Sequence, residues 1–179
     1  GGDKLTEIVG GQPLLRHLAS RALHTGLPVT VALSPDRPQR DSALRGLPLT
    51  RLTVPDAKAG IATTLRAGLA GLPSQAAVML LLADLPEITT EDIRQMAAAY
   101  ASTPNQILRA TDAAGQPGHP VIFPPDVRAD LMTLSGDDGA RAVLHRHKDR
   151  LRLIALPDQH ATTDLDTPEA WAAWRSGRE

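Results

Sequence analysis

The sequence predicts an α/β fold with a largely parallel sheet. Segments typical of β-strands alternate with segments whose apolar residues recur at helical spacing over nearly the whole chain. The run from Ala77 to Ala83 is continuously apolar, which is typical of a parallel strand buried on both faces. A length of 179 residues and a hydrophobic content of 42% suit one core, so we expect a single domain over residues 1–179.

Proline, glycine and capping residues mark the expected elements. Pro13 suits the first turn of a helix, where its missing N–H has no partner to lose. Thr89 or Thr90 is expected to cap a helix whose first turn contains Asp92. Further helices are expected from Gly60, after Pro124-Pro125, after Gly139 and over 168–174. Strands are expected over 29–33, 49–54, 77–83, 107–110, 121–123 and 151–156, with a glycine- and proline-containing turn over 115–120.

Composition excludes several classes of protein. A net charge of −1 argues against general nucleic-acid binding, which needs an excess of lysine and arginine. The absence of cysteine excludes disulfides and thiolate metal sites, and the histidines show no metal-binding spacing. No apolar run approaches the ~20 residues that span a bilayer, and no signal peptide is recognisable. We therefore expect a soluble cytoplasmic protein with neither nucleic acid nor membrane as a partner.

The chain opens with Gly1-Gly2-Asp3-Lys4, a first candidate for chemistry. Glycines allow a backbone to approach a phosphate closely, and the lysine adds a point charge. Taken alone, the stretch is more typical of a flexible, solvated terminus.

Asp84 is the second candidate, because it follows the most apolar expected strand. Ligands of open α/β sheets gather outside the carboxyl ends of the strands, and a carboxylate there is well placed to hold Mg²⁺. The alternative is an aspartate that only caps a helix or forms a turn.

Asp164 and Asp166 form the third candidate. Alternation along an extended chain puts both carboxylates on the same side, where they repel each other unless a cation or a donor lies between them. One can ligate a metal while the other caps the helix that begins near Pro168. The alternative is that both only cap that helix.

Two turns complete the candidates. The stretch from Gly136 through Asp138 to Arg141 leads into a helix, whose N-terminus and arginine can bind an anion; the alternative is an aspartate-capped helix with a solvated arginine. His119, in Gly118-His119-Pro120, is expected in a turn before a strand, where it can contact a substrate. Covalent catalysis and dinucleotide oxidoreduction lack support, since neither a Gly-x-Ser-x-Gly elbow, a cysteine nucleophile, a Gly-x-Gly-x-x-Gly loop nor a Walker A loop is present.

Taken in order, these pieces resemble the MobA/MocA-like molybdenum cofactor nucleotidyltransferases over essentially the whole chain. The first half carries the resemblance in Gly1-Gly2-Asp3-Lys4-Leu5, in Gly11 to Leu15, in Gly60 to Leu69 and in Leu82 to Pro86. The second half is similar to the cytidylyltransferase branch of that family. The segments that carry this similarity are Gly118 to Phe123, Ser135 to Arg141 and Asp164 to Glu169.

The resemblance implies a Rossmann-like, GT-A-like nucleotide-diphospho-sugar transferase fold with three layers. It also implies Mg²⁺-dependent transfer of CMP from CTP to the phosphate of molybdopterin, with release of pyrophosphate. Lys4 would contact the triphosphate, Asp84 would bind Mg²⁺ and Asp164 would be the second carboxylate, with Asp166 behind it. Residues expected to contact nucleotide or acceptor are Gly2, Lys4, Gly60, Thr63, Thr64, Gly118, His119, Gly136, Asp138 and Arg141.

The sequence departs from the family at its start. Members of the family begin with a strand and a loop of the type Leu-Ala-Ala-Gly-x-Ser-x-Arg-Met, which reads the base and wraps the phosphates. This chain starts at Gly1 without that segment. We expect that the segment belongs to the protein but lies outside this sequence. The preference for CTP over GTP therefore rests on the second-half motifs alone.

Two alternatives stay open at this point. One is a guanylyltransferase or a sugar-phosphate nucleotidyltransferase on the same fold. The other is a non-catalytic module that binds the cofactor and hands it over, or docks on a molybdoenzyme or its chaperone.

Overall fold

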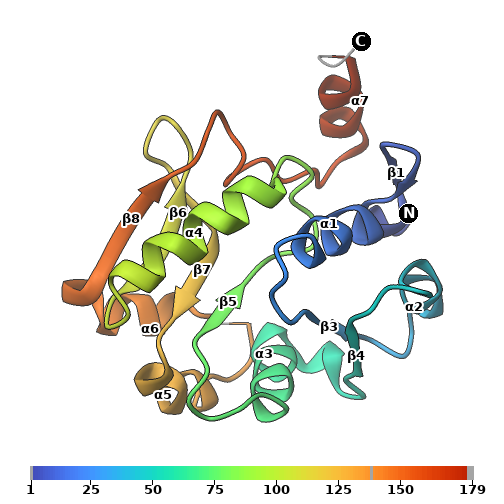
Figure 1. The fold of residues 1–179 in the computed structure, drawn as a ribbon. Coiled ribbons are helices and arrows are strands. Elements are labelled where there is room, and N and C mark those ends of the chain that lie inside the picture. Colours follow the sequence, from blue (N-terminus) through green and yellow to red (C-terminus); the bar gives the residue numbers. More distant parts are fainter. Residues whose placement is uncertain (1, 138, 177–179) are drawn as a thin grey trace.

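A computed structural model describes residues 2–137 and 139–176. Helices and strands alternate through most of the chain (Figure 1). The α-helices are α1 (Leu14–Leu23), α2 (Pro38–Ala43), α3 (Ile61–Ala70), α4 (Thr90–Ser102), α5 (Arg128–Met132), α6 (Arg141–Arg146) and α7 (Pro168–Ser176). The strands are β1 (Ile8–Val9), β2 (Gln12–Pro13), β3 (Thr30–Leu33), β4 (Thr50–Thr53), β5 (Val78–Leu80), β6 (Ile107–Thr111), β7 (Pro117–Phe123) and β8 (Leu151–Ala155). Short 3₁₀ turns are η1 (Lys4–Thr6), η2 (Ala57–Ala59), η3 (Pro125–Val127) and η4 (Lys148–Arg150).

The strands of the described residues form one larger sheet and two pairs. The larger sheet has the order β5-β7-β6-β8, and β3 pairs with β4 in parallel. Strand β7 runs antiparallel to β5 and β6, whereas β8 runs parallel to β6, so three of these four strands share one direction. The expectation of a mostly parallel sheet is confirmed, and the reversed strand β7 is the exception among these strands. The β6–β7 hairpin explains it, because a tight turn can only join antiparallel neighbours.

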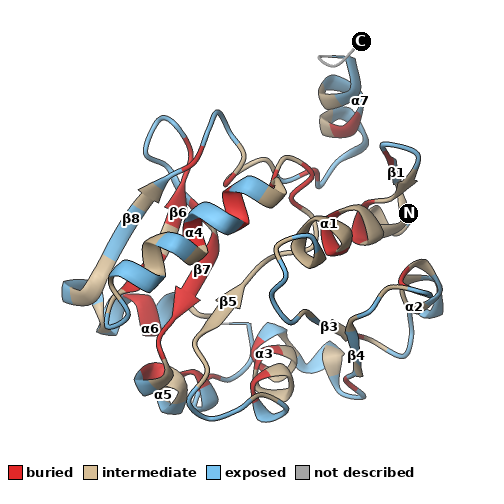
Figure 2. Ribbon diagram, viewed as in Figure 1, coloured by how far each residue is buried: buried red, intermediate tan, exposed pale blue. Residues whose placement is uncertain are grey.

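Helices cover both faces of this sheet, which gives the expected three layers. On one face, apolar residues of α1 and α4 pack on Leu108 and Ile122. On the other, residues of α3, α5 and α6 pack on Ile107, Val121 and Phe123. Alternate residues of β6 and β7 thus face opposite layers, as the two-residue period of a strand requires. Figure 2 shows that buried residues concentrate in β6, β7 and the inner sides of these helices.

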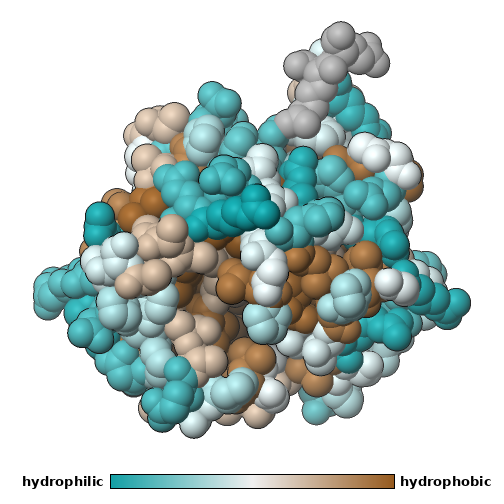
Figure 3. Space-filling model, viewed as in Figure 1, coloured by the Kyte–Doolittle hydropathy of each residue, from teal (hydrophilic) through white to brown (hydrophobic). Residues whose placement is uncertain are grey.

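An apolar cavity of about 360 Å³ lies between strand β3 of the β3–β4 pair and strand β5 of the larger sheet. Val29 to Ala32 and Val78 to Ala83 line it without interruption. Because alternate residues of a strand point to opposite faces, an uninterrupted lining means that the cavity lies against the edges of β3 and β5. Side chains of α1 and α3 close it on the two faces, and apolar residues gather at the centre of the view in Figure 3.

Most expected elements are confirmed, with small shifts at their ends. Thr89 caps α4 in a capping box, since its Oγ1 accepts from the Asp92 amide and the Asp92 side chain accepts from the Thr89 amide. The expected strand over 77–83 is shorter, because only Val78–Leu80 finds a partner strand. Helix α2, turn η1 and the β1–β2 hairpin were not anticipated, since each is too short to show a periodic pattern.

The two ends of the described chain pack together. Val9 and Leu14 form a small buried cluster with Leu165 and Trp171, which joins the β1–β2 hairpin and α1 to α7. This cluster brings the first residues beside the segment between β8 and α7. None of the helices in the described part of the chain has the length and apolarity needed to span a bilayer.

Candidate active site at the carboxyl edge of the sheet

Asp84 lies just beyond the carboxyl end of β5, as the sequence predicts. Its side chain is largely buried, with 19% of its surface exposed. Oδ2 lies 2.7 Å from the ammonium of Lys4, whereas Oδ1 is buried without a hydrogen-bond partner among the described residues. A buried carboxylate oxygen without a partner is costly, and a bound cation would remove that cost.

Asp164 and Asp166 reach the same place from the segment between β8 and α7. Leu165 between them is buried, and its carbonyl accepts from Trp171 Nε1 at 3.0 Å. Burying this middle residue turns both neighbouring carboxylates to the other side of an extended chain. The expectation that the two carboxylates share a side is thus confirmed. The alternative that they only cap α7 is wrong, since Thr167 Oγ1 accepts from the Ala170 amide instead.

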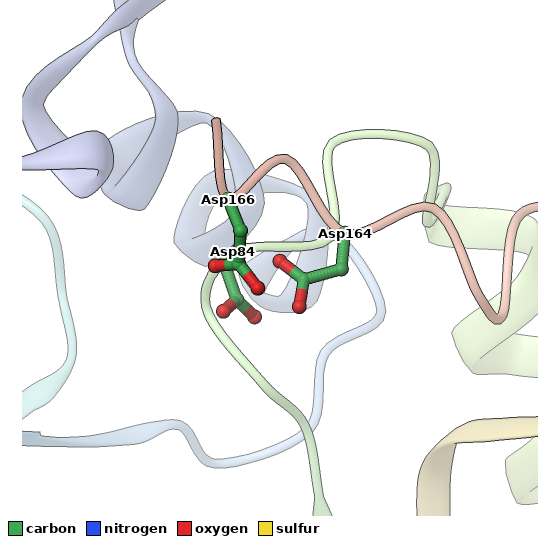
Figure 4. A group of neighbouring side chains, drawn as sticks. All are labelled: Asp84, Asp164 and Asp166. Carbon is green, nitrogen blue, oxygen red and sulfur yellow. The ribbon is translucent and has the colours of Figure 1, made fainter. Parts of the chain in front are cut away.

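Lys4 holds the three carboxylates together (Figure 4 shows the acids). Its Nζ donates to Asp84, to Asp164 Oδ1 at 3.2 Å and to Asp166 Oδ1. One oxygen from each carboxylate lies within 4.8 Å of the others. Three carboxylates share one ammonium group, so the cluster lacks positive charge.

The pKa shifts follow from this crowding. Burial opposes the charged form of Lys4, but the neighbouring carboxylates outweigh it and hold the lysine pKa above its ordinary value. Burial and repulsion from Asp84 raise the pKa of Asp164 against the pull of Lys4. The hydrogen bond from Lys4 lowers the pKa of the more exposed Asp166. The cluster therefore favours any additional cation.

The acidic cluster fits a divalent metal ion. Hard cations such as Mg²⁺ take carboxylate oxygens, and one oxygen each from Asp84, Asp164 and Asp166 supplies such a set. The Oδ1 of Asp84 has no other partner among the described residues. Sequence spacing alone could not show that the two segments converge.

Asp3 and Arg40 fix the position of Lys4. Asp3 caps η1 by accepting from the Leu5 amide at 3.2 Å. The guanidinium of Arg40, on α2, donates to both Asp3 oxygens at 2.7 and 2.9 Å. This hydrogen-bonded pair lowers the pKa of Asp3. Arg40 was not predicted, because α2 itself was not. Gly2 precedes this cap, and its contact with the nucleotide stays a prediction.

Arg109 on β6 and Arg141 on α6 lie close together and form a basic wall, and His119 on β7 lies close to both Arg109 and Asp84. His119 belongs to β7, not to a turn, because the antiparallel ladder begins at Pro117. Burial lowers the pKa of His119, and Asp84 and Arg109 both lie close enough to influence it. Arg109 donates its Nε to the Gly118 carbonyl at 3.1 Å; burial, then the nearby Arg141, lower its pKa.

Arg109 is a residue that the sequence reading missed. The available signal was a charged side chain inside the otherwise apolar segment Ile107 to Ala110. Arg141 begins α6 and is exposed, and α6 starts from Ala140 without a side-chain cap, unlike the aspartate-capped alternative. Asp138 lies outside the described residues.

Of the predicted glycine and threonine residues, Gly60, Thr63 and Thr64 lie at the start of α3, and Gly136 packs against Gly60. Gly60 precedes α3 with φ +110°, and a Cβ there would lie 2.4 Å from the Gly136 carbonyl oxygen. Gly60 and Gly136 thus permit close backbone packing. Thr63 receives a long contact from Arg66, and Thr64 borders both the apolar cavity and a polar hollow of about 300 Å³ near Arg40.

Gly118 in β7 likewise permits close backbone packing. A Cβ at Gly118 would lie 1.9 Å from the Ala161 carbonyl oxygen, and that oxygen accepts from the His119 amide at 3.0 Å. The absence of a side chain therefore lets β7 fasten the segment that carries Asp164.

The three-layer fold thus places the acidic cluster outside the carboxyl ends of its strands, where open α/β sheets bind their ligands. The model of the MobA-like NTP transferase domain matches residues 1–151. The chain belongs to this family of nucleotidyltransferases. No curated protein sequence matches it.

Solved structures share the fold at low sequence identity. Rv0371c from Mycobacterium tuberculosis H37Rv superposes with a TM-score of 0.84 and 22% identity, over 98% of this chain and 90% of that one. A complex of Rv0371c with manganese superposes with a TM-score of 0.82 and 22% identity, over 97% of this chain and 91% of that one. CMP:2-keto-3-deoxy-manno-octonic acid synthetase complexed with CTP superposes with a TM-score of 0.77 and 13% identity, over 98% of this chain and 91% of that one. These likenesses concern the fold.

Proposed function

We propose that this protein transfers CMP from CTP to the phosphate of molybdopterin and releases pyrophosphate. The observation that carries the proposal is the buried, unpartnered Oδ1 of Asp84 beside Asp164 and Asp166. Membership of the MobA-like NTP transferase domain family supports the reaction class. The resemblance of the second-half motifs supports the cytidylyl donor and the molybdopterin acceptor.

Asp84, Asp164 and Asp166 would hold Mg²⁺. Bound there, the ion would neutralise triphosphate charge and reduce repulsion between two anionic substrates. Manganese in the Rv0371c complex is consistent with a divalent cation on this fold.

The protein's own residues position the reactants and compensate charge. An oxygen of the acceptor phosphate attacks the α-phosphorus of CTP, and the bond from that phosphorus to the oxygen bridging to the β-phosphate breaks, so pyrophosphate leaves. The acceptor is already an anion, so no strong general base is needed. Lys4 would stabilise the charge that develops on the pyrophosphate, and Arg109 and Arg141 would attract anionic groups at the basic wall.

Gly60, Thr63 and Thr64 would line the nucleotide, with Gly2 beside the phosphates. Gly118, His119, Gly136 and Asp138 would lie on the acceptor side. The cytoplasm as the place of the reaction, and a molybdoenzyme or its chaperone as the recipient, stay predictions of the sequence.

The test supplies each nucleoside triphosphate separately with Mg²⁺ and molybdopterin, and measures pyrophosphate and the mass of the product. We expect pyrophosphate and a molybdopterin-CMP product with CTP. A preference for GTP would assign a guanylyltransferase instead. Binding of molybdopterin without pyrophosphate from any triphosphate would refute transfer and indicate a non-catalytic carrier.

A further inference from the structure

A second, polar cavity of about 910 Å³ adjoins the acidic cluster. Its walls come from the β6–β7 turn, from the segment between β8 and α7, and from Trp174 of α7. Asp164 borders this cavity and also belongs to the acidic cluster, so a molecule in the cavity would lie next to the site of transfer.

His160 lines this cavity and is held by a buried aspartate. Its Nδ1 lies 2.8 Å from Oδ2 of Asp92, whose side chain is 3% exposed. The same oxygen accepts from the amide and the hydroxyl of Thr89, each at 2.7 Å. An oxygen that accepts from amide and hydroxyl groups acts as a carboxylate, so His160 Nδ1 donates its proton to it.

This hydrogen bond selects one tautomer of the imidazole. With the proton on Nδ1, the neutral ring leaves Nε2 as an acceptor. In residues 2–137 and 139–176, no hydrogen bond to this Nε2 is present. A buried carboxylate that fixes the ring and the free nitrogen of an imidazole is a common way to prepare a histidine for a ligand.

The other polar groups of the cavity are mainly acceptors as well. Carboxylates of Glu87, Asp158 and Asp164 border it, and no lysine or arginine of the described chain does so. Glu87 also accepts from Trp174 Nε1 and Asp164 from Lys4, whereas the amide of Gln159 offers both a donor and an acceptor. Asp112 is saturated by the amides of Ala114 and Gln116 and by the hydroxyl of Thr162. The acidic lining of this cavity repels an anion and favours a group that brings N–H or O–H donors.

We propose that this cavity is the subsite for the uncharged, donor-rich part of the acceptor substrate. His160 accepts a hydrogen bond through Nε2, and Asp92 is the positioning residue that orients the ring. The inference deepens the proposed function and rests on it for the identity of the reaction. A hydroxylated chain and an amino-substituted ring share the required chemistry, so the experiment examines both.

Binding is tested first, without turnover. Nitrogen-15 NMR of histidine side chains, with the His160 signals assigned through His160→Gln, reports the tautomer and ligand contact. The protein is titrated with 6-hydroxymethylpterin, with ribitol and with inorganic phosphate. We expect the Nδ1–H tautomer, and a shift of Nε2 with the pterin or with ribitol but not with phosphate. The Nε2–H tautomer, a response to phosphate alone, or no response to either donor-rich probe would overturn the proposal.

Kinetics separate a binding role from a structural one. His160→Ala should raise KM for the acceptor by roughly 10–100-fold with KM for CTP unchanged, and His160→Gln, which keeps an acceptor, should recover much of the loss. Asp92→Asn should also raise the acceptor KM. Thr89→Ala is the matched control, because it weakens the same helix cap but keeps the His160–Asp92 bond, and it should leave the acceptor KM unchanged.

An unchanged acceptor KM in His160→Ala, or an equal rise for CTP, would refute the subsite while leaving nucleotidyl transfer intact. Conversely, the NMR response without pyrophosphate release from any triphosphate would refute the proposed function and leave the subsite standing.

Discussion

Asp84 and Asp92 lie a short stretch of chain apart, between the end of β5 and the first turn of α4, yet their surroundings are opposite. Asp92 is buried, and its side chain is matched by Thr89 and His160. Asp84 shares one ammonium with two other carboxylates and keeps a buried oxygen without a partner. A carboxylate whose hydrogen bonds are satisfied stabilises the fold, whereas a crowded carboxylate with an unpartnered oxygen is suited to bind a ligand.

The largest expected effect falls on activity at the crowded cluster. Asp84→Asn should reduce CMP transfer by about 10³-fold or more, because it removes charge from the proposed metal site. The free energy of unfolding should change little or rise, since repulsion with Asp164 is relieved. Steady-state pyrophosphate release and urea unfolding measure the two effects. Near-normal transfer by the variant would contradict the metal assignment.

Removing the carboxylate of Asp92 should act mainly on stability. Asp92→Ala removes the shared acceptor of the α4 cap and leaves Thr89 and His160 without it, so the free energy of unfolding should fall by about 3 kcal/mol. Urea unfolding at neutral pH checks this. A loss below about 0.5 kcal/mol, the range of ordinary surface substitutions, would show that the cap is unimportant.

Divalent metal should distinguish the acidic cluster from the α4 cap in the absence of nucleotide. At a metal concentration 100 times Kd, Mg²⁺ or Mn²⁺ should stabilise the wild type by about 2.7 kcal/mol, and EDTA should reverse the effect. Thermal unfolding should show the same gain in Thr89→Ala, whose acidic cluster is intact. The double variant Asp84→Asn/Asp164→Asn should gain nothing, and an undiminished gain there would place the ion elsewhere.

The smallest effect concerns the Asp3–Arg40 pair that positions Lys4. Arg40 lowers the folded pKa of Asp3, so this pair stabilises the protein above the ordinary value of 3.8 and loses that contribution as pH falls below it. Arg40→Met should cost about 1 kcal/mol at pH 7 and almost nothing near pH 2. Urea unfolding at both pH values tests the sign. An equal loss at both would mean that packing, not charge, links η1 to α2.

The same contrast explains what the sequence could predict. Asp84 follows an apolar strand and Thr89 begins a capping box, so both were recognisable from local patterns. The pairing of β7 with β5 and the anchoring of Asp3 by Arg40 join segments that are distant in the sequence, which periodicity does not encode. The role of His160 could not be predicted from the sequence. Its partner Asp92 is already accounted for by the helix cap, so nothing in the sequence suggested a second partner.

Binding of a metal ion at Asp84 can be observed directly. A crystal grown with Mn²⁺ and CTP, measured at the manganese absorption edge, would locate the ion by anomalous scattering. We predict a peak coordinated by Oδ1 of Asp84 and by carboxylate oxygen from Asp164 or Asp166, with the Lys4 ammonium moved toward the triphosphate. Lys4 still bound to all three carboxylates, with manganese and CTP located elsewhere, would contradict the account.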